Sequence, residues 1–144
     1  MVAMDEAALA TFLEAEFPQA DGQFRVDRLT DEGLILRLVV DHTHLRPGGT
    51  VSGPAMFGLA DVAVYLAILS RIGPEALAVT TNCSIDFMRK PEAGKDVLAE
   101  ARILKLGRRL AVADAYLTSD GHDDVVARAS LTYSIPPTAR PGAD

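Results

Sequence analysis

The residue of this chain best placed to carry out chemistry is an acid, Asp61, which lies inside an otherwise apolar run at residues 54–69. Burying an ionised carboxylate is costly unless the group is paired or protonated. Perturbed carboxylates cluster at functional sites, where an aspartate can activate water as a general base or attack directly as a nucleophile. A structural aspartate that is hydrogen-bonded to a neighbouring strand fits the run equally well, so the run alone leaves both interpretations open.

A turn rich in glycine and proline, RPGGTVSGP at residues 46–54, leads directly into the apolar run and predicts that a helix begins there. The first N–H groups of a helix have no partner within it, and the helix dipole makes this end positive. Such an end can hold a developing negative charge. Asp61 follows about two helical turns later, so the helix N-terminus and the carboxylate together form a candidate active site.

The spacing of apolar residues predicts the elements that position this site. Helical spacing covers residues 5–16, and the long apolar helix runs over 53–71, where Gly73 and Pro74 stop it. Period-two alternation predicts strands at 23–29, 34–41, 79–87, 97–106, 110–118 and 125–135. In the third of these strands, one face is predicted to carry Val79, Thr81, Cys83, Ile85 and Phe87.

This order of elements predicts an α+β fold, in which an antiparallel sheet wraps one long central helix. Because nearly every residue of that helix is apolar, we expect it to be buried all round. The predicted organisation is a helix and lead-in over residues 1–20, one domain over 21–136 and a disordered tail over 137–144.

Composition narrows the functional class. A chain of 144 residues with 49% hydrophobic content suits one domain, and a net charge of −6 argues against general nucleic-acid binding. The acidic N-terminal stretch lacks the basic region of a secretory signal, and residues 54–69 fall short of the roughly 20 needed to span a membrane. With Cys83 as the only cysteine, no internal disulfide or cysteine-based zinc site is expected. A cytoplasmic protein is expected.

Basic residues are concentrated in one stretch of this acidic chain. Residues 89–109 hold seven of the 14 Lys and Arg residues and only three acids. The cluster could bind the phosphates of a small molecule, or it could be a set of solvated strand ends and turns. Charge alone favours the second interpretation.

Three motifs in order carry a resemblance to a known family. They are GTVSGP at 49–54 with LAD at 59–61, IDFMRKP at 85–91, and LGRR at 106–109 followed by a hairpin Asp-Gly at 120–121. Over residues 28–136, the chain resembles the acyl-CoA thioesterases of the phenylacetate-degradation (PaaI) type, which have the hot-dog fold.

The resemblance implies roles for individual residues. It implies that the Gly53 N–H polarises the thioester carbonyl, that Asp61 is the general base or nucleophile, and that Thr80 helps to position water. It also implies that coenzyme A enters as part of the substrate and that no other cofactor or metal is needed. The phosphates of coenzyme A are then bound by four basic side chains, Arg89, Lys90, Arg108 and Arg109. Such proteins pair edge to edge as homodimers, with the site between subunits, and two dimers commonly form a homotetramer.

The motif departs from the family pattern at three positions. Ser52 replaces the motif histidine, Pro54 replaces the second glycine, and Arg46 stands where another polar residue is usual. Proline is well tolerated in the first helical turn, and Ser52 can cap the helix. The departures leave Gly53 and Asp61 in place, but they motivate a rival function, a domain that binds acyl-CoA without hydrolysing it.

Other reactive groups fit the sequence less well. His42 and His44 form a possible metal pair without an obvious third ligand, and a triad of Ser52, His44 and Asp61 lacks the nucleophile-elbow motif of serine hydrolases. Cys83 alternates with apolar residues, as a core cysteine does. A hydroxyacyl dehydratase ranks last because its helix would need a histidine. Tyr65, one turn after Asp61, either lines an acyl tunnel or packs in the core.

Overall fold

A computed structural model describes residues 2–20 and 22–137, so residues 138–144 of the predicted tail lie outside the described part. Its helices are α1 (Glu6–Glu16), α2 (Gly53–Ile72) and two short 3₁₀ helices, η1 (Pro18–Ala20) and η2 (His42–His44). The strands are β1 (Phe24–Leu29), β2 (Gly33–Leu38), β3 (Val79–Phe87), β4 (Val97–Leu106), β5 (Leu110–Ser119) and β6 (Val125–Ser134).

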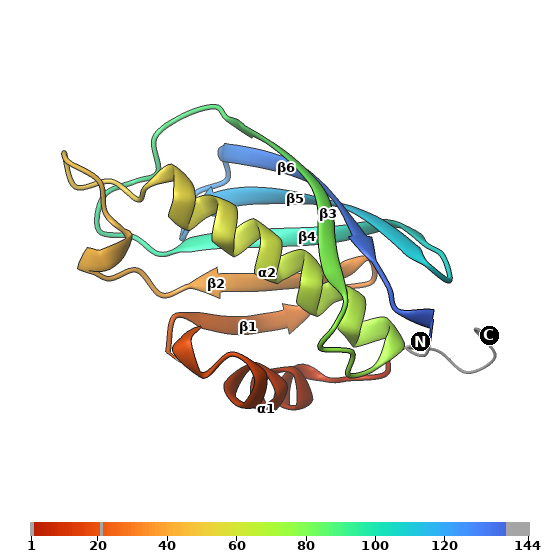
Figure 1. Cartoon of the computed structure of the whole chain (residues 1–144). Helices are drawn as coiled ribbons and strands as arrows, with labels where there is room; N and C mark the ends of the chain where they lie inside the picture. The colour runs from red at the N-terminus through yellow and green to blue at the C-terminus, as the bar shows by residue number, and fades with distance from the viewer. Residues whose placement is uncertain (1, 21, 138–144) are drawn as a thin grey trace.

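The six strands form one antiparallel sheet in the order β1-β2-β4-β5-β6-β3. The sheet curves around α2, and α1 lies along β1 at one edge (Figure 1). The predicted α+β hot-dog fold, with a sheet wrapped around a central helix and a short N-terminal helix, is confirmed.

Small side chains allow α2 to lie close to the sheet. Where the helix meets β4 and β5, both sides contribute buried alanines: Ala60, Ala63, Ala67, Ala99, Ala101, Ala113 and Ala115. At Gly33 a side chain is sterically impossible, because a Cβ there would lie 2.0 Å from the Ala101 carbonyl oxygen. Close packing of this kind fixes the helix, and therefore its N-terminus and Asp61, relative to the strands.

The prediction that α2 is buried all round is wrong for one stripe of its surface. Pro54 and Phe57 are exposed, and Gly58, Asp61 and Val62 are only half-buried. These residues recur at three- and four-residue intervals, so they lie on one face of the helix. Phe57 retains 39% of its accessible surface. By length and composition alone α2 could cross a membrane, but most of it is enclosed by the sheet.

Strand β3 is the unpaired edge of the sheet, since β1 at the other edge packs against α1. Its predicted alternation is wrong at the start, because the pairing with β6 shifts between Thr80 and Asn82. This bulge places Thr80 on the less exposed side together with Cys83 and Ile85. The bulge turns Thr80 toward α2, whereas an unbroken two-residue period would turn it away.

Candidate active site

The Asp61 carboxylate is held by two hydroxyl groups from different strands. Thr80 Oγ1 donates to Asp61 Oδ1 at 2.6 Å, and the Tyr133 hydroxyl donates to the same oxygen at 2.7 Å. The Tyr133 hydroxyl also lies 3.0 Å from the Asp61 backbone carbonyl oxygen. No hydrogen bond from a described residue reaches Oδ2, so this oxygen is available to accept a hydrogen bond from a bound molecule.

Both neighbours of the carboxylate that could ionise are kept neutral. Burial, reinforced by the charge of Asp61, raises the pKa of the Tyr133 hydroxyl well above its usual range. Burial, again with a contribution from Asp61, raises the pKa of the half-buried Cys83 thiol. Tyr133 therefore remains a hydrogen-bond donor at physiological pH. Cys83 is half-buried where a core position was predicted, and its raised pKa does not suit a nucleophile.

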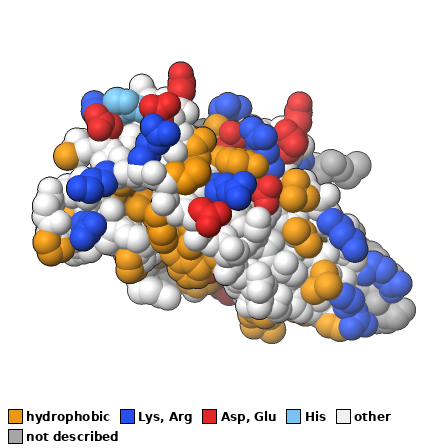
Figure 2. Space-filling model, turned by 90° about the horizontal axis from the view of Figure 1, so that it is seen from above, with side chains coloured by type: hydrophobic (Ala, Val, Ile, Leu, Met, Phe, Trp, Pro, Cys, Tyr) orange, Lys and Arg blue, Asp and Glu red, His pale blue; other side chains and the backbone are white. Residues whose placement is uncertain are grey.

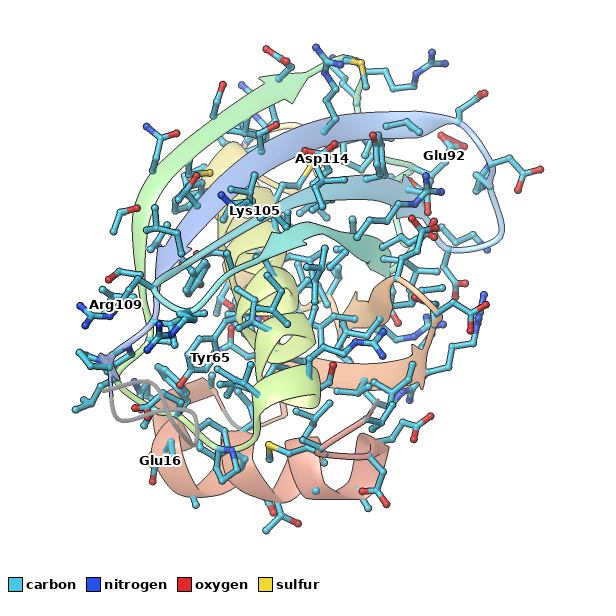
Figure 3. All side chains as sticks on the ribbon, turned by 90° about the vertical axis from the view of Figure 1, so that its right-hand side faces the viewer. Glu16, Tyr65, Glu92, Lys105, Arg109 and Asp114 are labelled. Carbon is cyan, nitrogen blue, oxygen red and sulfur yellow. The ribbon has the colours of Figure 1, made fainter. Side chains whose placement is uncertain are left out.

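Asp61 opens into a cavity of about 310 Å³ between α2, the start of β3 and the end of α1. Its lining consists of Phe17, Asp61, Val62, Tyr65, Ala78, Val79, Thr80 and Tyr133. The sequence left open whether Tyr65 lines a cavity or packs in the core, and in the structure it does both. Figure 3 shows Tyr65 inside the curve of the sheet, on the side toward α1 and Glu16.

The N-terminus of α2 has one backbone donor that the helix does not use. Ser52 caps the helix as predicted, since its Oγ accepts from the Ala55 N–H at 3.3 Å. Pro54 has no N–H, and Gly53 is the first helical residue, whose N–H lacks an intrahelical acceptor. Beside Gly53 lies a second cavity, of about 400 Å³, lined by Arg46, Thr50, Val51, Gly53, Met56, Phe87, Met88, Arg89, Lys90 and Pro91.

One chain cannot bring Gly53 and Asp61 to the same substrate atom. Eight residues of helix separate them, which is about 12 Å along the axis at 1.5 Å per residue. Reacting groups must lie within about 3–3.5 Å of each other. The two cavities accordingly lie at opposite ends of β3, one beside Phe87 and one beside Val79 and Thr80.

The four predicted phosphate-binding residues also fall into two groups. Arg89 and Lys90 line the cavity at Gly53, where Arg89 pairs with Asp124 at 3.4 Å on the surface. Arg108 and Arg109 lie in the β4–β5 hairpin, near the β6 end that pairs with Val79. Figure 2 shows basic side chains at both ends of one face, with a mixture of hydrophobic, basic and acidic side chains between them.

The histidine alternatives gain no support from the structure. His44 is buried, its Nδ1 accepts from the Asp41 N–H at 2.9 Å, and its Nε2 lies 3.2 Å from Gln23 Oε1. Because both ring nitrogens are occupied and Ser52 caps α2, these groups do not form a triad with Asp61. Among the described residues no cluster of His, Cys, Asp and Glu suited to a metal ion is found.

Sequence reasoning missed two residues of the Asp61 cavity. The two-residue period of the strand predicted at 125–135 puts Tyr133 on one face with Ala127, Ala129, Leu131 and Ile135. As the single polar member of that set, Tyr133 could have been recognised. Phe17 lies just beyond α1, where it forms the C-cap. No sequence signal connects Phe17 to Asp61, because only the packing of α1 brings the two together.

The chain belongs to the thioesterase superfamily, whose family model matches residues 48–126, more than half of the chain. A candidate esterase of Pseudomonas aeruginosa, PA0474, is 35% identical over 104 residues, which cover 72% of this chain and 75% of that protein. The match to the family model spans both the helix N-terminus and Asp61. Membership supports thioester hydrolysis as the general activity.

Solved structures agree with this assignment. A candidate thioesterase from Silicibacter sp. TM1040 is similar over 95% of both chains, with a TM-score of 0.89 and 56% identity. The phenylacetic acid degradation protein PaaI from Thermus thermophilus, solved as a mutant, is similar over 83% of this chain and 99% of that chain. Its TM-score is 0.70 at 31% identity. The resemblance identified from the motifs is therefore confirmed.

Proposed function

We propose that this protein hydrolyses acyl-CoA thioesters to a free acid and coenzyme A, at a site built from two copies of the chain. The observation that carries the proposal is the Asp61 carboxylate, which is fixed through Oδ1 by two neutral donors and lines an open cavity. The basic groups near both cavities add the means to bind the phosphates of coenzyme A.

The position of β3 at the edge of the sheet supports a homodimer. An unpaired edge strand can pair with another strand, and a two-fold axis would pair β3 with its own copy in antiparallel orientation. The Phe87 end of one chain would then lie beside the Val79 end of the other. This arrangement would bring Gly53 next to Asp61 of the partner subunit. The face of α2 that its own chain leaves exposed or half-buried would then lie at the interface between the two chains. Two such dimers forming a tetramer remain a further expectation.

The chemistry then requires one water molecule. The thioester carbonyl oxygen accepts a hydrogen bond from the Gly53 N–H, and Asp61 of the partner subunit removes a proton from water as the water oxygen attacks the carbonyl carbon. The negative charge on the former carbonyl oxygen is held at the N-terminus of α2. When the C–S bond breaks, the sulfur takes the proton from the carboxyl group, which yields the acid and free coenzyme A. Direct attack by the carboxylate, through an anhydride that water then cleaves, uses the same geometry.

Release of free coenzyme A from a panel of acyl-CoAs tests the proposal. The altered motif residues Ser52, Pro54 and Arg46 favour the rival, a domain that binds acyl-CoA without turnover. Hydrolysis of any member of the panel that depends on Asp61 supports the thioesterase. Tight binding with no release of coenzyme A by the wild-type protein would instead establish the binding domain.

The hydroxyl of Tyr133 is expected to contribute to kcat by orienting Asp61. Tyr133→Phe removes only the hydroxyl, and it leaves the ring packed against Tyr65, 6.0 Å away between ring centroids. A hydrogen bond to a charged group contributes about 1.5–3 kcal/mol, so kcat should fall by roughly tenfold or more, with little change in KM. Tyr116→Phe is the matched control, because that hydroxyl donates to Asp114 away from the site. If Tyr133→Phe and Tyr116→Phe have equal kcat, the Tyr133 hydroxyl does not orient Asp61 for catalysis.

The basic hairpin is expected to bind the phosphates of coenzyme A. Reversing the charges of Arg108 and Arg109 to Glu should raise KM several-fold with little effect on kcat, and added salt should weaken the difference. The same double reversal at Arg25 and Arg28, on β1 at the far edge of the sheet, controls for net charge. If the two double variants have the same KM, Arg108 and Arg109 do not bind the phosphates of coenzyme A.

A further inference from the structure

Aromatic rings form much of the wall of the cavity beside Asp61. Phe17 meets the Tyr65 ring edge-on, with centroids 5.6 Å apart and planes at 87°. Phe12 and Tyr133 contact the same Tyr65 ring at 6.2 and 6.0 Å. Three rings, from α1, the segment that follows it and β6, therefore hold the Tyr65 ring of α2 in one position.

The Tyr65 ring presents carbon, not oxygen, to the cavity. The Tyr65 hydroxyl donates to the Ala76 carbonyl oxygen at 3.2 Å, which turns it away from Asp61. Burial, with smaller contributions from Glu16 and Glu75, raises the pKa of this hydroxyl to about 12, so it stays neutral. The polar groups of the lining, Asp61, Thr80 and Tyr133, are bonded to one another. The rest of the wall is apolar, as expected for a pocket that receives a hydrocarbon group.

The depth and volume of the cavity limit what it can hold. Tyr65 follows Asp61 by four residues, so the Tyr65 ring, against which Phe17 packs, begins only about 6 Å further along the helix axis. The cavity volume of about 310 Å³ is about twice that of an apolar cavity known to hold one benzene molecule, roughly 150 Å³. Within one chain, this space suits a short aliphatic chain or a single ring.

We propose that Phe17, braced against Tyr65, ends the acyl pocket and restricts the enzyme to compact acyl groups. This inference rests on the proposed function, because it assigns the acyl half of the substrate to the Asp61 cavity. Phe17 lies outside the residues that the family model matches. Acyl selection is thus set by the N-terminal segment, whereas the reacting groups lie within the matched region.

Truncating Phe17 tests the inference in two independent ways. In the wild-type background, Phe17→Ala should raise kcat/KM for decanoyl-CoA and palmitoyl-CoA by about tenfold or more relative to butanoyl-CoA, since one methylene in an apolar pocket alone changes discrimination about 10-fold or more. In an Asp61→Asn background, titration calorimetry should show the same selective gain in affinity for the longer chains. Phe17→Leu, a milder change at the C-cap, should shift both measures in the same direction by less.

Phe12→Leu is the matched control, because Phe12 contacts Tyr65 without lining the cavity. Its chain-length profile should remain that of the wild type. Unchanged ratios in both Phe17 variants would overturn the inference, and so would a wild-type protein that already binds palmitoyl-CoA as well as butanoyl-CoA. The binding arm does not require turnover, so a failure of hydrolysis would refute the proposed function while the calorimetry still decides the role of Phe17.

Discussion

Asp61→Asn is expected to lower kcat by at least about 100-fold, the scale of a lost general base. The amide keeps the shape of the side chain and can still accept hydrogen bonds from Thr80 and Tyr133, so the fold and the affinity for substrate should survive. It cannot take a proton from water or act as a nucleophile. The variant therefore separates chemistry from structure more cleanly than Asp61→Ala does.

Steady-state release of free coenzyme A measures the effect, and Asp114→Asn serves as the control. Asp114 accepts hydrogen bonds from Ser130 and Tyr116 away from the cavity, at 3.0 and 3.4 Å. Its amide variant should retain wild-type turnover. If Asp61→Asn also retains it, then both the base and the nucleophile roles are wrong, and Asp61 is a structural group of α2.

Gly53→Pro is expected to lower kcat by about 10²–10³-fold, the usual cost of removing one oxyanion donor. Proline is compatible with the first helical position, and Ser52 already has the extended backbone, with ψ at 158°, that a following proline requires. The substitution thus deletes the N–H while it preserves the helix start. KM should change little, because the lost interaction forms mainly as negative charge develops.

Gly53→Ala separates the effect of added bulk from the effect of losing the N–H. A Cβ at residue 53 would lie 3.4 Å from Phe87 Cζ, an ordinary contact, and the alanine variant keeps its donor. It should therefore retain most of the wild-type kcat. Similar losses in both variants would show that bulk beside Phe87, and not the N–H, limits the rate.

The sequence predicted those parts of the structure that depend on local pattern. The alternation in residues 97–106 and 125–135 was enough to predict β4 and β6, and the Gly-Pro stop placed the end of α2 near Ile72. Asp61 drew attention because a carboxylate conflicts with its apolar neighbours. Each of these features is encoded within a few residues, where spacing and composition have direct physical meaning.

Other features depend on contacts between distant residues and could not be predicted in this way. The bulge that turns Thr80 toward Asp61 arises from the register between β3 and β6. Tyr133 reaches the carboxylate from 72 residues away, and Phe17 reaches the cavity through the packing of α1. The open stripe on α2 was predicted to be buried because apolar composition does not specify whether a side chain is covered by its own chain or by a second one.

The account centres on a site shared between two chains, and complementation between two inactive variants tests it directly. Asp61→Asn and Gly53→Pro chains that carry different affinity tags can be co-expressed, and the mixed assembly can be isolated by purification over both tags. One of the two sites in a mixed dimer combines an intact Gly53 with an intact Asp61 of the partner subunit. The account predicts about half of the wild-type release of free coenzyme A per dimer. A mixed dimer as inactive as its parents would contradict it.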